Sequence, residues 1–187
     1  MENTSGTKHQ HMVLFPWLAM GHVIPFFNLS KLLAKKGHTI YFISTPRNLL
    51  RLPKLTPNIS SLITLLPLPL PHVQSLPHDV ECTVNIPYHK QQSLKLRFDL
   101  LQSPLTTNLQ ESTPDWVIYD YASHWLPKVV AELGVSRAFF SLFNAAFLAF
   151  IGPPSVLLNE DSRTTAKELW CLNGFPLNPT LFFVCMK

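Results

Sequence analysis

Short apolar runs alternate with amphipathic segments along most of the chain, and this alternation restricts its fold more than any other sequence feature. The runs are rich in β-branched and aromatic residues and are closed by turn-forming residues, which is typical of buried strands. Pro cannot donate a hydrogen bond within a central strand, so the third run ends where its prolines begin. Five strands are predicted, over Met12–Leu18, Thr39–Thr45, the start of Ser60–Pro71, Asp115–Asp120 and Arg137–Phe143.

The segments between these runs have apolar residues at helical spacing. The first opens at Pro25, which suits the first helical turn, and stops at Gly37, which suits a helix end. The longest follows a loop over His72–Pro87 and carries a stripe of Leu94, Phe98, Leu101, Leu105 and Leu109. Helices are predicted over Pro25–His38, Tyr88–Glu111, Trp125–Gly134 and Ala145–Ile151.

Strands that alternate with helices and are apolar along their whole length indicate a parallel sheet covered by helices on both faces. The predicted fold class is therefore α/β. A hydrophobic fraction of 47% with 14% charged residues excludes a disordered chain. At roughly 150 residues per domain, 187 residues make one domain and a remainder.

The charges, the cysteines and the apolar windows exclude several classes of partner and location. The net charge of +4 includes no basic run, so no nucleic-acid partner is expected. Cys82, Cys171 and Cys185 form no close pair, which argues against a disulfide framework or a zinc site and fits a reducing, cytoplasmic location. The apolar window Ala138–Leu158 contains Asn144 and a Gly-Pro-Pro sequence, which favours a buried strand and helix over a membrane span.

Two polar residues follow predicted strands at the edge where open parallel sheets bind ligands. His22 lies in the turn after the first strand, and Asp120 ends the fourth. Together they suit a catalytic dyad, in which the carboxylate orients the imidazole and stabilises its protonated form. The alternative is structural: His22 caps the following helix, and Asp120 accepts amide hydrogen bonds from its own loop.

The turn after the first strand lacks the glycines of a phosphate-binding loop. Its sequence, WLAMGHVIP, contains Gly21 alone, whereas a dinucleotide-binding turn needs GxGxxG. We therefore do not expect this part of the chain to hold a diphosphate by itself. Asp120, His124 and Glu132 match no common metal-ligand spacing, so no metal is expected.

Aromatic residues gather near the same predicted edge and suit the apolar wall of a pocket for a planar or sugar-bearing molecule. Each of them suits the hydrophobic core as well. Ser123 and Asn144 are polar residues at strand ends that suit either a hydroxyl-rich ligand or a helix cap. The aromatic candidates are Trp17, Tyr88, Tyr121, Trp125, Phe143 and Phe147.

Several long segments occur in the order found in one enzyme family. They are FPWLAMGHVIPFFNLSKLLAKKGHTIYFISTPRN, RLPKL, PDWVIYDYASHWLPKVVAELG, RAFFSLFNAAFLAF and GPPS. Over about Met12–Glu168 the chain resembles the N-terminal half of plant UDP-dependent glycosyltransferases. It is most similar to the UDP-rhamnose:rhamnosyltransferase-like branch, which extends existing glycosides.

The resemblance implies the N-terminal, acceptor-binding domain of a GT-B fold, in which two Rossmann-like halves face each other. It implies that His22 removes the proton of an acceptor hydroxyl and that Asp120 orients His22, with inversion at the sugar and without a metal. It assigns Asn144 to the donor sugar. Gly21, Ser123 and the aromatic candidates are expected to contact the acceptor. The implied partners are a UDP-sugar co-substrate, carrying glucose or rhamnose, and a flavonoid or terpenoid glycoside. The full-length enzyme is expected to be a monomer.

The end of the chain departs from this family. Family members are more than twice as long, and Trp170–Lys187 do not match the segment that follows in them. Codons permitted for Trp170–Lys187 spell a family-like sequence when they are read in a shifted frame. We therefore expect a polar tail over 1–11, an acceptor-binding domain over 12–168 and an aberrant tail over 169–187, with the UDP-sugar-binding domain absent.

Such a fragment is expected to be inactive alone, because it has nothing to stabilise the charge that develops on UDP. The alternative is a non-catalytic truncated product or an acceptor-binding module. The nucleotide sequence around Leu169 tests the origin of the tail. A family-like frame that overlaps the tail codons is expected, and its absence would exclude a frameshift.

Overall fold

The computed structural model of the chain describes residues 8–74, 76–77, 79–144 and 148. The chain divides into two compact units, Met1–Phe140 and Ser141–Lys187, and the first unit holds the sheet. The predicted helix over Ala145–Ile151, apart from Leu148, and the tail over 169–187 lie outside the described residues.

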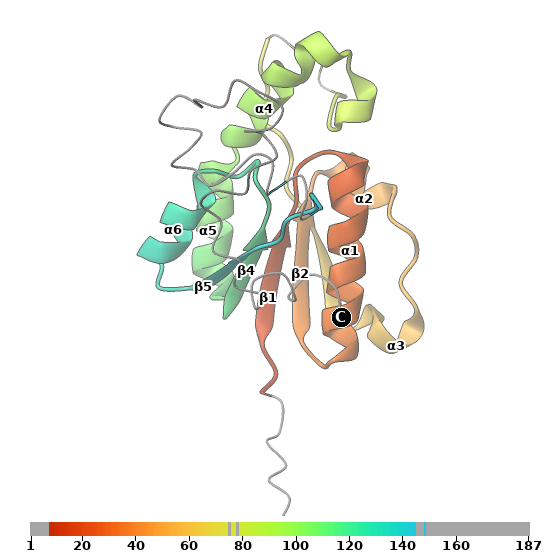
Figure 1. Cartoon of the computed structure of the whole chain (residues 1–187), viewed down its shortest axis with the longest axis vertical. Helices are drawn as coiled ribbons and strands as arrows, with labels where there is room; N and C mark the ends of the chain where they lie inside the picture. Colours follow the sequence, from red (N-terminus) through yellow and green to blue (C-terminus); the bar gives the residue numbers. More distant parts are fainter. Residues whose placement is uncertain (1–7, 75, 78, 145–147, 149–187) are drawn as a thin grey trace, which may run out of the picture. The chain divides into compact units, whose positions relative to one another are not determined.

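Five parallel strands form one sheet in the order β3-β2-β1-β4-β5 (Figure 1). This confirms the predicted α/β fold class with a parallel sheet. The strand order reverses beside β1, which pairs with β2 on one side and β4 on the other. In sheets of this kind, ligands bind beyond the carboxyl ends of the strands at that reversal. The strands are β1 (His11–Phe15), β2 (Thr39–Ser44), β3 (Ile63–Pro67), β4 (Trp116–Tyr119) and β5 (Ser136–Phe139).

Helices cover both faces of the sheet. On one face, Phe27 of α1 packs edge-on against Phe42 of β2, with 5.5 Å between ring centroids. On the other face, Phe15 of β1 stacks on Phe98 of α4 at 5.0 Å. The α-helices are α1 (Met20–Lys35), α2 (Pro46–Leu50), α3 (Pro57–Ser60), α4 (Gln91–Asp99), α5 (Gln102–Ser112) and α6 (Leu126–Glu132), and two 3₁₀ turns are η1 (Thr83–Asn85) and η2 (Tyr88–Lys90).

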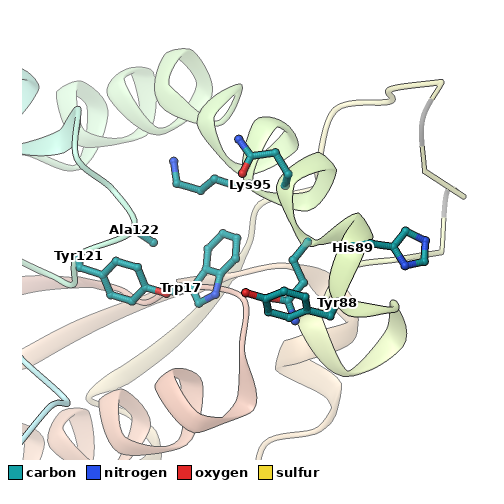
Figure 2. A pocket seen from close by; sticks show the side chains of 8 residues that line it. Trp17, Tyr88, His89, Lys95, Tyr121 and Ala122 are labelled. Atoms are coloured by element: carbon teal, nitrogen blue, oxygen red, sulfur yellow. The ribbon is translucent and has the colours of Figure 1, made fainter.

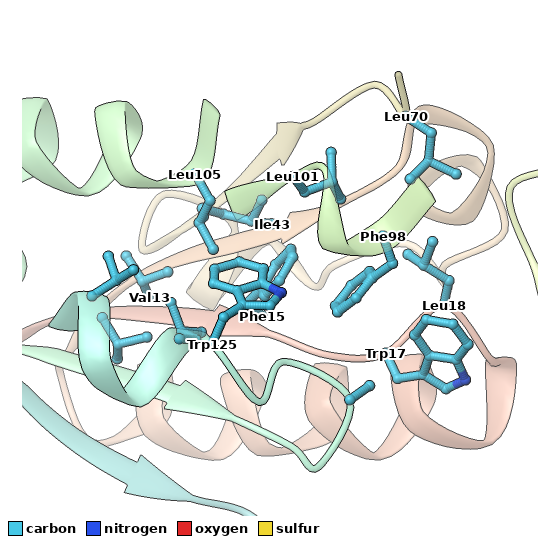
Figure 3. Packing of buried hydrophobic residues seen from close by; sticks show 14 of the residues in the cluster. Val13, Phe15, Trp17, Leu18, Ile43, Leu70, Phe98, Leu101, Leu105 and Trp125 are labelled. Atoms are coloured by element: carbon cyan, nitrogen blue, oxygen red, sulfur yellow. The ribbon is translucent and has the colours of Figure 1, made fainter. Parts of the chain in front are cut away.

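The large hydrophobic cluster lies between the sheet and α4, α5 and α6 (Figure 3). Alternation along β1 turns Val13 and Phe15 toward this cluster, and both are fully buried. The rings of Phe15, Phe98 and Trp125 meet at its centre, with centroid separations between 5.0 and 6.4 Å. The predicted helical stripe supplies the facing side, because all five of its residues are at most 1% exposed: Leu94, Phe98, Leu101, Leu105 and Leu109.

The first helix begins at Met20, five residues before the predicted start at Pro25. Pro25 therefore lies inside α1, where it has no N–H to donate to the carbonyl of Gly21. The helix still forms, because the amides of His22 and Val23 bond to the Ala19 carbonyl at 2.8 and 2.9 Å. The prediction was wrong at this point because an interior proline so near a helix start costs one bond without ending the helix.

A buried arginine organises the long connection between β3 and α4. Arg97 is 1% exposed, and its guanidinium donates to the carbonyls of Pro71 at 2.9 Å, Val80 at 3.0 Å and Pro77 at 3.2 Å. Burial lowers the pKa of Arg97, and the negative charge of Glu81 partly opposes that change. Nothing in the sequence distinguished Arg97 from a surface arginine on an amphipathic helix.

In the described part of the chain, no helix is both long and apolar enough to cross a membrane.

We predict that Arg97→Met destabilises the fold by about 2–4 kcal/mol, because several buried carbonyls lose their donor at once. Denaturant unfolding followed by circular dichroism measures this. Arg137→Met is the matched control, since Arg137 is exposed on β5 and its loss should cost less than about 0.5 kcal/mol. Equal unfolding midpoints for the two variants would contradict the role of Arg97.

Candidate active site

The candidate site is formed by the segments that follow β1 and β4. Phe15 pairs with Tyr119 at the ends of these strands, so the residues after them leave the sheet at the same level. The chain after β1 passes through Trp17 and enters α1, and the chain after β4 begins with Asp120. This register brings His22, in the first turn of α1, next to Asp120.

His22 and Asp120 are in direct contact. The Nδ1 atom of His22 lies 2.9 Å from Oδ2 of Asp120. An ionised carboxylate can only accept hydrogen bonds, so Nδ1 carries the proton and Nε2 keeps its lone pair. Asp120 is 2% exposed and the His22 side chain is 15% exposed, so the pair is buried at the carboxylate and open at the imidazole.

Asp120 has a structural role at the same time. Its Oδ2 accepts the amide N–H of Trp17 at 2.8 Å, and its Oδ1 accepts that of Ala122 at 3.1 Å. These are the loop amide bonds of the structural alternative, and they coexist with the His22 contact. The side chain of His22 makes no cap, because the cap position of α1 is Ala19 and no side-chain cap bond forms there.

Tyr121 connects the dyad to a neighbouring pocket. Its ring lies 5.4 Å from the imidazole of His22, between centroids, and is tilted by 59°. Burial raises the pKa of Tyr121, and the negative charge of Asp120 raises it further. The phenol therefore stays protonated at neutral pH and keeps its O–H as a donor.

An open pocket of about 430 Å³ lies beside the dyad, within the size range of small-molecule sites. Figure 2 shows the Trp17 indole between the rings of Tyr121 and Tyr88, while Lys95 extends from α4 toward the side formed by Tyr121 and Ala122. One wall is thus mainly aromatic, and the wall from η2 and α4 is mainly polar. The lining residues are Trp17, Tyr88, His89, Gln91, Gln92, Lys95, Tyr121 and Ala122.

Most of the polar wall was not predicted from the sequence. His89, Gln91, Gln92 and Lys95 belong to the predicted helical segment, but only its apolar stripe was considered. The available signal was the polar face opposite that stripe. The topology places this face over the carboxyl ends of the strands, and no local sequence pattern predicts that placement.

Other predicted site residues lie elsewhere. Trp125 is 8% exposed within the hydrophobic cluster, and its indole N–H donates to Asp99 at 3.1 Å. Ser123 is fully buried, with its hydroxyl 3.4 Å from the Asp120 carbonyl. A Cβ at Gly21 would meet nothing within 4 Å, so the backbone there is open. Phe143 and Asn144 belong to the second unit, and Phe147 is outside the described residues.

Over the described ranges, no group of three or more His, Cys, Asp or Glu side chains converges as metal ligands.

Comparison with curated proteins finds plant glycosyltransferases. UDP-glycosyltransferase 91C1 of Arabidopsis thaliana is 61% identical over 158 residues, which cover 84% of this chain and 34% of that protein. Soyasaponin III rhamnosyltransferase of Glycine max is 37% identical over 162 residues, which cover 87% of this chain and 34% of that protein. The chain thus spans about a third of the length of these relatives. No family model matches the chain.

Solved structures share the fold. Glycyrrhiza uralensis UGT73P12, complexed with glycyrrhetinic acid 3-O-monoglucuronide, aligns with a TM-score of 0.67 at 23% identity, covering 90% of this chain and 35% of its own. Arabidopsis thaliana UGT89C1, complexed with UDP-L-rhamnose, aligns with a TM-score of 0.66 at 24% identity. The alignment covers 87% of this chain and 42% of the UGT89C1 chain. The solved structures show the shared fold, and the curated relatives show that the chain is homologous to the N-terminal part of plant UDP-glycosyltransferases.

Proposed function

We propose that this chain is the acceptor-binding part of an inverting UDP-glycosyltransferase and that His22 is its general base. The observation that carries the proposal is the 2.9 Å contact between His22 Nδ1 and Asp120 Oδ2 beside an open pocket. The buried carboxylate leaves Nε2 as the atom able to take a proton. General-base help of this kind contributes about 10²–10⁴-fold in rate.

The proposed reaction is a single displacement. Nε2 of His22 takes the proton of an acceptor hydroxyl while the hydroxyl oxygen forms a bond to the anomeric carbon of the sugar. The bond from that carbon to the diphosphate oxygen breaks, its electron pair leaves with UDP, and the configuration inverts. Asp120 stabilises the imidazolium that results.

The proposed acceptor is a plant secondary-metabolite glycoside of the flavonoid or terpenoid class. Two kinds of support exist. The pocket combines aromatic rings, from Trp17, Tyr88 and Tyr121, with amide groups of Gln91 and Gln92, which suits a molecule that is partly apolar and partly rich in hydroxyls. Soyasaponin III rhamnosyltransferase and anthocyanidin-3-O-glucoside rhamnosyltransferase of Petunia hybrida are among the relatives.

The proposed donor is a UDP-sugar carrying glucose or rhamnose, held mainly by residues outside 12–168. The turn after β1 supports this division, because Gly21 is its single glycine and it has no phosphate-binding sequence. Asn144 remains the proposed donor-sugar contact, and Gly21, Phe143 and Phe147 remain proposed acceptor residues. Ser123 and Trp125, which are buried outside the pocket lining, are not retained in the proposal. The proposal includes a monomeric enzyme in the cytoplasm, a reducing compartment that suits the buried free thiol of Cys82.

A chimera tests the proposed base. Residues 1–168 joined to the C-terminal two-thirds of UDP-glycosyltransferase 91C1 should release UDP from UDP-glucose or UDP-rhamnose when a flavonol 3-O-glucoside is supplied. His22→Ala should lower kcat/KM by about 10²–10⁴-fold without changing the unfolding midpoint. His9→Ala is the matched control, because His9 binds the Gly37 carbonyl and lies before β1, away from the pocket. A His22→Ala chimera as active as its parent would refute the assignment.

Asp120→Asn in the same chimera should lower both activity and stability. In place of Oδ1, the amide nitrogen of an asparagine would face the N–H of Ala122. In place of Oδ2, it would face both the N–H of Trp17 and Nδ1 of His22, so at least one buried donor loses its partner. The expected cost is about 1–3 kcal/mol of unfolding free energy. Thermal unfolding and initial rates measure the two effects, and unchanged stability would contradict the structural role of Asp120.

The isolated 187-residue chain should bind an acceptor without transferring sugar. The turn after β1 has a single glycine and no phosphate-binding sequence to receive the charge that develops on UDP. Mass spectrometry of overnight reactions should find no UDP release above a protein-free blank. Robust turnover by the purified chain would show that the donor site is complete within these residues.

A further inference from the structure

Lys95 brings an ammonium group to the polar wall of the pocket. Its Nζ lies 2.5 and 2.7 Å from the two carboxylate oxygens of Asp99, one helical turn further along α4. Both side chains are only partly exposed, 27% for Lys95 and 29% for Asp99. Lys95 lines the pocket (Figure 2), and Asp99 holds its ammonium from outside the lining.

The pair is held in place by the core. Oδ1 of Asp99 accepts the indole N–H of Trp125 at 3.1 Å, and Trp125 is packed against Phe15 and Phe98. A lysine normally loses much rotamer freedom when it binds a ligand. Here the carboxylate has already restricted the ammonium, so less of that cost remains when a ligand arrives.

A second Lys–carboxylate pair with the same spacing, on α6, differs from the Lys95–Asp99 pair in distance and exposure. Lys128 and Glu132 are also four residues apart, but their charged atoms are 4.0 Å apart and their side chains are 86% and 65% exposed. Exposed pairs of this kind contribute little and leave the ammonium to water. The Lys95–Asp99 pair is shorter, less exposed and anchored to the core.

The charges around Nζ favour a neutral ligand group. Asp99 already compensates the ammonium, so an anionic ligand would have to compete with that carboxylate. The remaining neighbour is Nδ1 of His124 at 3.4 Å, a long contact. One N–H of Lys95 can therefore turn from His124 to a hydroxyl oxygen without losing a strong bond. Gln91 and Gln92 add amide groups on the same wall.

We infer that Lys95, positioned by Asp99, is a specificity-determining residue that donates a hydrogen bond to an uncharged sugar already attached to the acceptor. This inference rests on the proposed function of the pocket as an acceptor site. It predicts that the chain distinguishes a glycoside from its aglycone through one named ammonium group.

Calorimetric titration of the 187-residue chain tests the inference with quercetin 3-O-glucoside, quercetin and quercetin 3-O-glucuronide as probes. The unmodified chain should bind the glucoside more tightly than quercetin or the glucuronide. Lys95→Met should weaken glucoside binding by about tenfold, as expected when a charged donor is lost, and quercetin binding by less than about twofold. Lys95→Gln, which keeps a donor, should lose less than Lys95→Met.

Lys128→Met is the matched control and should leave all affinities within about twofold, because it breaks an exposed pair of the same spacing. Circular dichroism melts of each variant separate loss of binding from loss of fold. Equal weakening of glucoside and quercetin by Lys95→Met, or tighter binding of the glucuronide than of the glucoside, overturns the inference alone. Failure of the unmodified chain to bind any probe counts against the acceptor pocket itself and overturns both proposals.

Discussion

The hydrogen bonds accepted by the buried carboxylate of Asp120 are the interactions on which both the fold and the candidate site depend. The carboxylate accepts hydrogen bonds from the Trp17 and Ala122 amides and from His22, and so joins the chain after β1, the first turn of α1 and the chain after β4. A buried carboxylate without donors would be costly, so these segments are held together wherever the fold forms. The same bonds orient the imidazole. A role in folding and, under the proposed function, a role in orienting the general base are therefore two consequences of one geometry.

Arg97 plays a comparable role for the opposite wall of the pocket. The connection from β3 to α4 is long and rich in proline, and its carbonyls would be unpaired without the guanidinium that turns back into it. The amide of Thr83 then bonds to the Leu18 carbonyl at 3.0 Å, which fastens this connection to the loop that carries Trp17. Tyr88 and Lys95 follow directly along the chain. The polar wall is thus positioned by Arg97 of α4, whose buried guanidinium binds the carbonyls of the preceding loop.

The sequence was a good guide wherever a local pattern and the tertiary structure agree. The strand positions were predicted to within a few residues because each is a short apolar run. The burial of the stripe from Leu94 to Leu109 was also predicted, but two helices, α4 and α5, carry it instead of the single helix expected over Tyr88–Glu111. The start of α1 was missed because Pro25 suits a first helical turn, whereas here it lies inside the helix and removes one hydrogen bond without ending it. Trp125 was expected in the pocket and lies in the core, since an aromatic side chain suits both and long-range packing alone decides between them.

The pocket explains why this part of a glycosyltransferase is so poor in glycine and in phosphate-binding sequence. Its lining consists mainly of aromatic rings, amides and one compensated ammonium, and the His22–Asp120 pair lies beside it with an open imidazole. These groups suit an uncharged molecule that presents a hydroxyl. Tyr88 is 87% exposed and Tyr121 51% exposed, so much of the aromatic surface is in contact with water. Burial of those rings would supply binding energy to the acceptor's apolar body, and hydrogen bonds at His22 and Lys95 would fix its orientation. Under the proposed function, the affinity for the acceptor and its orientation therefore come from different residues. A change at Lys95 can for this reason alter selectivity while the dyad stays intact.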